Sequence, residues 1–274
     1  MNAEKSSIFN FQFSIMKVRA KKHLGQHFLI DMDIARRTAE SLPLAGKTDV
    51  LEIGPGMGVL TQFLLQNSDI NLTAIELDSE SVAYLHKHYP QLRVIEGDFL
   101  QLDLNKMFPE TNFRIIGNFP YNISSQILFR MLDYKDKIPA LCGMFQKEVA
   151  ERIASPAGKK AYGILSVLLQ AFYTVEYLFT ISEDVFDPPP KVKSAVVRLI
   201  RNDVSKLNCN EQLFKTVVKT AFNQRRKTLR NSIKPLLGKE SPIYADPIFD
   251  KRPEQLNVAE FVQLTNMIEE AQRS

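Results

Sequence analysis

The residues with the clearest chemical potential are the tetrad Asn118-Phe119-Pro120-Tyr121, which follows an apolar run predicted to be a buried strand. The Asn side-chain carbonyl and nearby backbone carbonyls can accept hydrogen bonds from a planar exocyclic amine, and the Tyr ring can stack on the attached base. An ordinary Asn-Pro turn at a strand end would use the same residue types. The tetrad alone therefore leaves both interpretations open, and its neighbouring motifs decide between them.

A glycine-rich turn lies upstream of the tetrad. An apolar strand runs into glycines at positions 54, 56 and 58, and a helical pattern follows. Glycines let a backbone approach a ligand closely, and a helix start offers free N–H groups. The spacing is G-x-G-x-G with Val59 next, whereas a dinucleotide fingerprint requires G-x-G-x-x-G. The spacing therefore argues against a nicotinamide dinucleotide.

Two further predicted strands end in carboxylates. Glu76 lies about twenty residues past the glycines, where a carboxylate can bind ribose hydroxyls. Asp98 follows the next strand and could accept from the amine of an adenine ring, with Phe99 beside it. Ligands of open α/β sheets bind at the carboxyl ends of the strands. Four consecutive strand ends with such signals predict one nucleoside-binding cleft.

This order of motifs resembles that of a Class I S-adenosylmethionine-dependent methyltransferase. The residues within the motifs resemble those of the ribosomal RNA adenine N6,N6-dimethyltransferases of the KsgA type. The resemblance runs from about Lys21 to the C-terminus. Three further segments carry it, namely residues 22–29 (KHLGQHFL), 186–199 (FDPPPKVKSAVVRL) and 221–231 (AFNQRRKTLRN). Two positions depart from the family pattern. His27 replaces a common Asn and keeps a polar group for the cofactor, and Phe119 replaces an aliphatic residue and is expected to reshape the target pocket slightly.

The resemblance implies an activity as well as a fold. Methyl groups would pass from S-adenosylmethionine to the exocyclic N6 of two adjacent adenosines, giving N6,N6-dimethyladenosines. The implied target is the 3′-terminal hairpin loop of small-subunit (16S) ribosomal RNA, within a 30S assembly intermediate. Unpaired bases in a loop flip out at low cost, so such a target is physically sensible.

The residues expected to serve this reaction form two groups. The resemblance assigns cofactor contacts to His27, Leu29, Gly54, Glu76, Asp98 and Asn118, and Gly56 and Phe99 join them from the same turns. The target amine would donate to the Asn118 side chain and the Pro120 backbone, which favours a more tetrahedral nitrogen with its lone pair directed at the methyl group.

Tyr121 and Phe186 are expected to stack on the target base. Asp187 and the three prolines after it indicate a loop that presents Phe186 and stiffens its backbone. The alternative for Phe186 is a core residue on a strand flank.

The charge distribution points to a polyanionic partner. Residues 205–274 hold 12 basic and 8 acidic residues, which accounts for the whole net charge of +4. From Leu213 to Lys239 there are eight basic residues and no acidic one. A one-signed block of this length indicates RNA phosphates. The RNA-binding candidates are Arg225, Arg226, Lys227 and Arg230, with Lys22 from a smaller basic cluster near the N-terminus.

Composition excludes several other classes. The most apolar stretch, residues 161–181, is interrupted by Gln170 and Glu176 and divides into a core helix and a strand, so a membrane span is not expected. Cys142 and Cys209 lie outside any metal-ligand spacing, and no metal site is expected. Two isolated cysteines and the lack of a signal-peptide pattern favour a reducing cytoplasm.

Strand and helix patterns alternate from Asp31 to about Arg201, which predicts an α/β fold with a mostly parallel, Rossmann-like Class I methyltransferase sheet and an antiparallel last strand. The last two strands, residues 174–181 and 194–200, are expected to form a hairpin. Helices are expected over residues 33–41, 58–66, 79–88, 124–132, 147–153, 164–172, 211–221, 225–232 and 258–271. Three parts follow: residues 1–16, disordered or a gene-model extension before a true start at Met16, a catalytic domain over 17–204, and a small all-helical RNA-binding domain over 205–274.

Alternatives share parts of this pattern. A macrolide-resistance type enzyme that dimethylates large-subunit RNA would have the same glycine turn and tetrad, but the segment 222–231 and the long C-terminal region favour the small-subunit enzyme. A ribosome-assembly or transcription factor could keep the fold without the chemistry, but such a protein does not need the turn or the tetrad, and both are present here. The one-signed basic block argues against a small-molecule substrate, and charge alone leaves DNA open.

Overall fold

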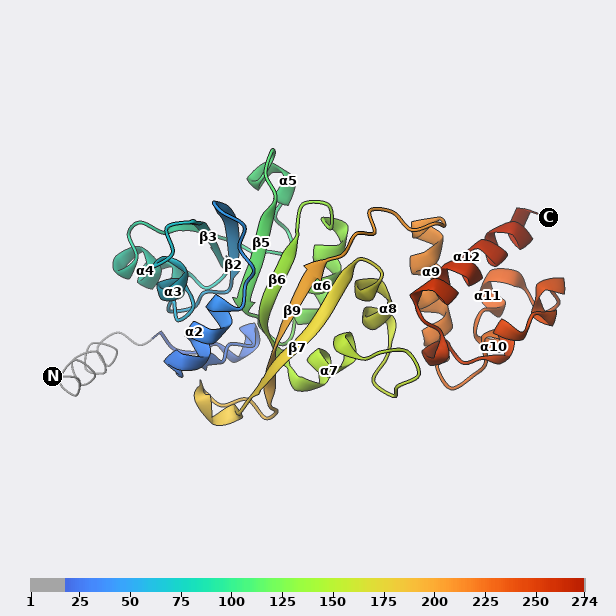
Figure 1. Ribbon diagram of the computed structural model, residues 1–274. Coiled ribbons are helices and arrows are strands. Elements are labelled where there is room, and N and C mark those ends of the chain that lie inside the picture. The colour runs from blue at the N-terminus through green and yellow to red at the C-terminus, as the bar shows by residue number, and fades with distance from the viewer. Residues whose placement is uncertain (1–17, 274) are drawn as a thin grey trace.

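A seven-stranded sheet runs through the centre of the molecule in this computed structural model, which describes residues 18–273 (Figure 1). The strand order is β4-β3-β2-β5-β6-β9-β7. The strands are β2 (Thr48–Ile53), β3 (Ile70–Glu76), β4 (Arg93–Glu96), β5 (Phe113–Asn118), β6 (Ala140–Gln146), β7 (Tyr173–Ile181) and β9 (Ser194–Arg201). The expected extension over residues 1–16 lies outside the described residues.

The direction of the strands confirms the predicted fold class. Strands β2 to β6 pair in parallel, and β9 inserts between β6 and β7 and runs antiparallel to both. The predicted hairpin of the last two strands is therefore present as β7 and β9. Because a parallel sheet is covered on both faces, its strands are nearly continuous apolar runs, which made them visible in the sequence.

Helices cover both faces of the sheet. Side chains of a strand alternate between faces, so Leu51 and Ile115 join the apolar cluster of α6, α7 and α8, whereas Val50 and Ile116 join that of α2, α3 and α4. These helices are α2 (Met32–Glu40), α3 (Thr61–Leu64), α4 (Ser79–His88), α6 (Ser124–Asp133), α7 (Lys147–Ala154) and α8 (Ile164–Gln170), and a short α5 (Leu104–Met107) was not predicted.

Two of the predicted helices begin later than expected. The helix predicted from residue 58 starts only at Thr61, because Gly58 has φ +83° and lies in the preceding turn. The helix predicted over residues 225–232 is helical only from Leu229 to Ser232, as α10. Arg225, Arg226 and Lys227 lie in a turn instead.

The C-terminal part is helical, and residues 202–273 contain no strand. Its helices are α9 (Glu211–Asn223), α10 (Leu229–Ser232), α11 (Lys234–Leu237) and α12 (Val258–Arg273), with 3-10 turns η3 (Pro242–Ala245), η4 (Pro247–Asp250) and η5 (Pro253–Gln255) between α11 and α12. Each of these turns begins with a proline, which fits the first position of a helical turn because its missing N–H needs no partner there. The sheet ends at Arg201, and the predicted boundary at 204 falls in the connection to α9.

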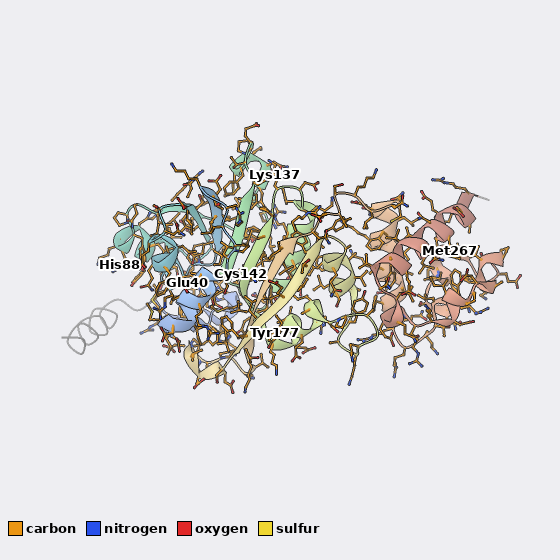
Figure 2. The ribbon with its side chains drawn as sticks, viewed as in Figure 1. Glu40, His88, Lys137, Cys142, Tyr177 and Met267 are labelled. Atoms are coloured by element: carbon orange, nitrogen blue, oxygen red, sulfur yellow. The ribbon has the colours of Figure 1, made fainter. Side chains whose placement is uncertain are left out.

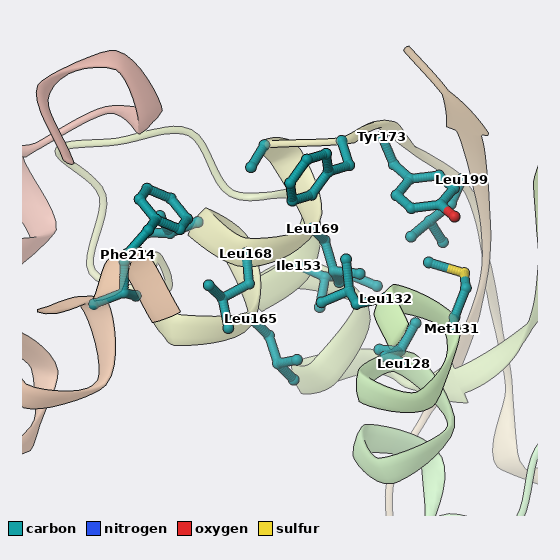
Figure 3. Close-up of a cluster of buried hydrophobic side chains, with 14 of the residues drawn as sticks. Leu128, Met131, Leu132, Ile153, Leu165, Leu168, Leu169, Tyr173, Leu199 and Phe214 are labelled. Carbon is teal, nitrogen blue, oxygen red and sulfur yellow. The ribbon is translucent and has the colours of Figure 1, made fainter. Parts of the chain in front are cut away.

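The helical part and the sheet part share one apolar cluster. Phe214 of α9 lies beside Leu165 and Leu168 of α8, and the cluster continues to Leu128 and Leu199 (Figure 3). The apolar contacts therefore continue across the junction of the two parts.

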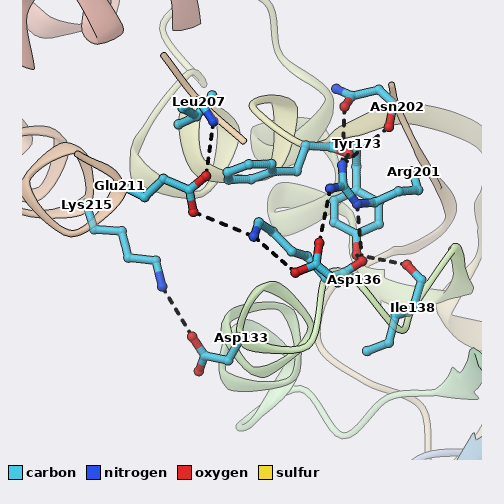
Figure 4. A network of polar contacts seen from close by, with 11 residues as sticks. Asp133, Asp136, Ile138, Tyr173, Arg201, Asn202, Leu207, Glu211 and Lys215 are labelled. Atoms are coloured by element: carbon cyan, nitrogen blue, oxygen red, sulfur yellow. Dashed lines mark hydrogen bonds and ion pairs between the residues drawn. The ribbon is translucent and has the colours of Figure 1, made fainter. Parts of the chain in front are cut away.

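Charged groups border this junction (Figure 4). The Lys135 ammonium lies 3.6 Å from the carboxylates of both Asp136 and Glu211, and Lys215 of α9 lies 3.3 Å from Asp133 of α6. These ion pairs join α9 to the end of α6 beside the apolar cluster.

A two-stranded sheet that was not predicted lies beside the main one. Strand β1 (Phe28–Leu29) pairs antiparallel with β8 (Phe186–Asp187). This pairing fixes the N-terminal segment against the chain between β7 and β9.

No helix within residues 18–273 is long and apolar enough to cross a membrane. Both cysteines are free thiols; Cys142 is buried in β6, near the middle of the sheet (Figure 2), and Cys209 precedes α9.

Candidate functional site

One cleft lies across the carboxyl ends of β2, β3, β4 and β5. It encloses about 910 Å³, part of which is open to solvent. Each strand end contributes to its lining: Gly54 and Gly56 after β2, Glu76 and Leu77 at the end of β3, Asp98 and Phe99 after β4, and residues 118–123 from β5 onward. Residues 24–28 close another side. Gly56 and Tyr121 therefore line the same hollow.

The glycine turn takes a backbone shape that suits glycine. Gly54 and Gly56 have φ of +67° and +56°, in the left-handed region. A Cβ on Gly56 would lie 2.8 Å from the Phe28 ring, so Gly56 also makes room for the β1 segment. The turn thus exposes backbone to the cleft while β1 packs directly over it.

Glu76 closes the turn from the end of β3. Its carboxylate accepts from the backbone N–H of Gly56 at 3.0 Å, of Leu77 at 2.8 Å and of Asp78 at 2.9 Å. Burial raises the pKa of the Glu76 carboxyl, and the three N–H donors oppose that rise. Since a carboxylate has about four acceptor positions, one is left for a hydroxyl in the cleft.

Asp98, Phe99 and Leu77 form the next part of the lining. One Asp98 oxygen accepts from the Leu100 N–H at 2.9 Å, and the other oxygen has no hydrogen bond among the described residues. Phe99 is almost fully buried, whereas the Leu77 side chain is 53% exposed. An apolar side chain with that exposure inside a cleft can cover the face of a flat ring. Leu77 is not among the residues predicted from the sequence, although its place directly after Glu76 was a usable signal.

The two polar groups of Asn118 have separate surroundings. Its Nδ2 donates to the His27 carbonyl at 2.9 Å. That bond orients the amide and leaves Oδ1 as an acceptor in the cleft. The side chain therefore links β5 to the N-terminal segment and still has one group for a ligand.

Tyr121 is held from two directions. Its hydroxyl hydrogen-bonds to the Ser194 hydroxyl at the start of β9, and its ring stacks on His27 with centroids 5.3 Å apart. Burial raises the pKa of the Tyr121 hydroxyl, although the Ser194 bond opposes the rise. Tyr121 is thus a neutral, fixed ring beside the acceptor of Asn118.

His27 ties the N-terminal segment to the proline segment. Its Nδ1 lies 2.7 Å from the Pro188 carbonyl, and because a carbonyl only accepts, Nδ1 carries the proton. The ring lines the cleft.

Two predicted site residues do not line the cleft. Leu29 and Phe186 are 4% and 2% exposed and pack in the apolar cluster of α2, α3 and α4. The loop expected for Phe186 is wrong, because Phe186 begins β8. Side chains alternate along a strand, so Phe28 faces the cleft where Leu29 cannot. Phe186 could stack on a base only by leaving this cluster.

The unusual Phe119 fits a slot in the sheet. A Cβ on Gly117 would lie 2.8 Å from its ring, and Gly143 of β6 borders the same ring. Phe119 is 1% exposed and packs on Phe145 with centroids 5.0 Å apart. Because these two glycines have no side chains, they leave room for much of the extra volume of the ring.

The predicted RNA-binding residues lie in two places. Lys22 is exposed in the 3-10 turn η1 (Lys22–Leu24), next to the cleft wall. Arg225 donates to the Lys160 carbonyl, and Arg230 pairs with Asp250 at 2.5 Å. Arg226 and Lys227 are exposed in the turn before α10, which lies at the far end of the molecule from β2 and β3 (Figure 1).

Within residues 18–273 no group of three or more His, Cys, Asp or Glu side chains could hold a metal ion. The polar lining of the cleft is made of carboxylates, amides, the side chains of His27 and Tyr121, and backbone groups.

A parallel sheet with one antiparallel strand inserted next to its edge, and a glycine turn opposite a carboxylate, define a Class I methyltransferase. The fold is similar to that of a crystallised dimethyladenosine transferase from Plasmodium falciparum, with a TM-score of 0.74 and 26% identity over 90% of this chain and 98% of that chain. It is also similar to the 23S rRNA methyltransferase ErmE, with a TM-score of 0.63 and 24% identity over 88% of this chain and 99% of that chain.

The chain belongs to the Ribosomal RNA adenine dimethylase family, whose model matches residues 17–270. It is 66% identical over 250 residues to the Ribosomal RNA small subunit methyltransferase A of Parabacteroides distasonis, covering 90% of this chain and 93% of the relative. It is 60% identical over 255 residues to the protein of that name from Flavobacterium johnsoniae, covering 92% and 97%.

Proposed function

We propose that this protein transfers methyl groups from S-adenosylmethionine to N6 of two adjacent adenosines in the 3′-terminal hairpin loop of small-subunit ribosomal RNA. The observation that carries the proposal is the single cleft in which the glycine turn and Glu76 meet the Asn-Phe-Pro-Tyr tetrad. The names of the relatives support the small subunit as the target. The partner is an assembly intermediate of the 30S subunit, and the reaction takes place in the cytoplasm.

The lining of the cleft fits the cofactor group by group. Glu76 has one acceptor position left for a ribose hydroxyl, and Asp98 has one free oxygen for the amine of the adenine ring. Leu77 can cover that ring, and Gly54 and Gly56 line the cleft beside the remaining part of the cofactor. When bound, S-adenosylmethionine supplies a methyl group on a positively charged sulfur, which is a strong electrophile.

The protein's own task is to align the target nitrogen. An adenine amine is a poor nucleophile because its lone pair is delocalised into the ring. Asn118 Oδ1 and the Pro120 carbonyl can each accept a hydrogen bond from one amine N–H, which directs the nitrogen lone pair away from the ring plane. The Pro120 carbonyl already accepts from Ile123 N–H at 3.2 Å and has a second lone pair. No protein nucleophile is required, because positioning supplies the acceleration.

Tyr121 holds the target base by stacking. Stacking of a base on an aromatic side chain contributes about 1–3 kcal/mol. The contacts of Tyr121 with Ser194 and His27 fix the ring beforehand, so little side-chain freedom is lost when a base binds. Exposed cations such as Arg226 and Lys22 bind the RNA backbone outside the cleft.

The test is a map of methylated nucleotides. The protein is incubated with labelled S-adenosylmethionine and unmethylated small subunits, with large subunits in a parallel reaction. We expect label on two adjacent adenosines of the small-subunit hairpin loop only. Label on a large-subunit adenine would overturn the proposal in favour of the macrolide-resistance activity, and subunit binding without label would favour an assembly factor.

A further inference from the structure

The basic residues between Leu213 and Lys239 differ in whether their charged groups contact acidic, carbonyl or aromatic groups of the protein. Several are engaged within the protein: Lys215 pairs with Asp133, Arg230 pairs with Asp250, Arg225 donates to a backbone carbonyl, and the Lys219 ammonium lies 5.7 Å from the centre of the Phe129 ring. Their charges are partly neutralised or directed inward. They are less available to a polyanion than the sequence suggested.

Three lysines of the block gather around one hollow. Lys227 comes from the turn after α9, Lys234 from α11, and Lys239 from the turn that follows α11. The hollow also encloses about 910 Å³, counting its open part, and its lining includes the amides of Gln224 and Asn231. No carboxylate lines it, and within residues 18–273 none of the three lysines forms an ion pair with a carboxylate that would neutralise it.

We propose that this hollow binds phosphate groups of the RNA backbone, in addition to the contacts made by Arg226 in the neighbouring turn. The inference rests on the proposed function, since it takes RNA as the substrate. It adds Lys234 and Lys239, both of which lie outside segment 221–231 that carried the family resemblance.

The chemistry of the lining favours phosphates over other anions. Three ammonium groups with no carboxylate among them make a concentrated positive field, and a lysine ammonium binds phosphate as a point charge. Lys234 Nζ donates to Asn231 Oδ1 at 3.0 Å, and Asn231 Nδ2 donates to Thr228 Oγ1 at 3.2 Å. This chain of hydrogen bonds holds Lys234 over the hollow and reduces the freedom it would lose on binding.

Continuity with the neighbouring turn supports RNA as the ligand. Lys227 follows Arg226 directly, so a backbone that contacts the turn reaches the hollow within a residue or two. The acidic residue nearest in sequence to these three lysines is Glu240, directly after Lys239. It is exposed and does not line the hollow.

The test compares two double charge reversals. Lys234→Glu with Lys239→Glu removes two contacts, and its control is Lys47→Glu with Lys106→Glu. Lys47 and Lys106 are exposed, and they lie just before β2 and in α5, both far from α11 in Figure 1. The net charge changes equally in the two variants. Affinity for unmethylated small subunits is measured over a range of salt concentrations, and binding of S-adenosylmethionine is measured alongside.

We expect the Lys234/Lys239 variant to bind subunits at least about tenfold more weakly at moderate salt, with the slope of log affinity against log salt reduced by about two. The control variant should stay near the wild type, and both should bind the cofactor normally. Equal loss in both variants, or wild-type affinity in the Lys234/Lys239 variant, would overturn the inference. If the Lys234→Glu/Lys239→Glu variant folds poorly, the variant Lys234→Gln with Lys239→Gln is measured in its place. Its neutral side chains should also reduce the slope of log affinity against log salt.

A photoreactive amino acid at position 235, on the rim of the hollow, identifies the ligand directly. It should cross-link to RNA, and cross-linking to a ribosomal protein alone would contradict the proposal. Methylation of the same subunits by the wild type tests the proposed function separately from the proposed binding of RNA in the hollow. If the wild type methylates them and the Lys234/Lys239 variant binds normally, the inference fails and the proposed function stands.

Discussion

At the scale of single residues, Asn118 holds the N-terminal segment through one group of its amide and leaves the other group for the proposed substrate. Its Nδ2 donates to the His27 carbonyl, and its Oδ1 has no hydrogen bond among the described residues, while the residue lines the cleft. Replacement by Ala removes the proposed acceptor for the target amine without changing the basic surfaces. We expect Asn118→Ala to lose about 100-fold or more in turnover, as when one preorganised hydrogen bond to a reacting group is removed. RNA affinity should fall by less than tenfold, and unchanged methylation of subunits would remove Asn118 from the mechanism.

Glu52 is a buried acid behind the glycine turn. It is 1% exposed, and its carboxyl accepts from the Thr61 hydroxyl at 2.7 Å, which joins the end of β2 to the start of α3. Burial raises the pKa of Glu52 from 4.5 to about 8. In the unfolded chain the group ionises near the lower value, so between the two values the folded protein holds a proton that the unfolded chain releases.

This difference sets the sign of a pH dependence. The stability contributed by protonated Glu52 is complete below about pH 4.5 and is lost as the pH rises to about 8, at up to roughly 1.4 kcal/mol per pH unit. Glu52→Gln cannot ionise, so its free energy of unfolding should rise relative to the wild type as the pH goes from 5 to 8. Denaturant titrations at several pH values measure this difference. The same change at exposed Glu110 is the control. The prediction would be contradicted by a difference in free energy of unfolding between the wild type and Glu52→Gln that stays constant with pH.

At the scale of elements, the pairing of β1 with β8 carries the N-terminal segment to the cleft. Phe186 is the buried anchor of that pairing, 2% exposed among Leu29 and other apolar side chains. Phe186→Leu keeps most of the apolar volume. If packing is its role, the change should cost less than about 1.5 kcal/mol of stability and leave turnover nearly unchanged. Thermal unfolding and methylation assays on the same samples separate the two roles, since a stacking residue would lose activity with little loss of stability.

The elements that could be predicted from sequence are those determined locally. The central strands of the main sheet, such as β5 and β6, are apolar runs whose buried faces leave little choice of register. The β1 and β8 pair was missed because two residues carry no pattern until they meet across the fold. The turn at Arg225 was read as a helix from its residue types, but Lys227 N–H bonds to Gln224 O and Leu229 N–H bonds to Lys251 O, so tertiary contacts decide the chain direction.

The candidate site follows the same rule. Glu76, Asp98 and Asn118 could be placed together from sequence because the carboxyl ends of parallel strands meet at one edge. The cleft-facing position of Phe28, in place of Leu29, could not be found, since it depends on the pairing of β1 with the distant β8.

At the scale of the whole molecule, the boundary near residue 204 divides the chain by secondary structure but not by core. Sheet residues such as Phe113 and helix residues such as Phe261 belong to one continuous apolar cluster, and ion pairs border the junction. A shared core holds the basic C-terminal surface at a fixed position relative to the cleft. RNA bound at that surface would therefore present its loop to Asn118 in a reproducible orientation.

Phe214 tests whether this core unfolds as one unit. The ring is 1% exposed and packs between α9 and α8, at the junction of the two parts. We expect Phe214→Ala to cost about 3–5 kcal/mol because it removes a large buried ring and leaves a cavity. If the core is shared, hydrogen exchange of the slowest amides in β5 and in α12 should speed up by the same factor, within a single unfolding transition. Faster exchange confined to α9 and α12, with β5 unaffected, would mean that the C-terminal helices unfold independently and that their orientation toward the cleft is not fixed by packing.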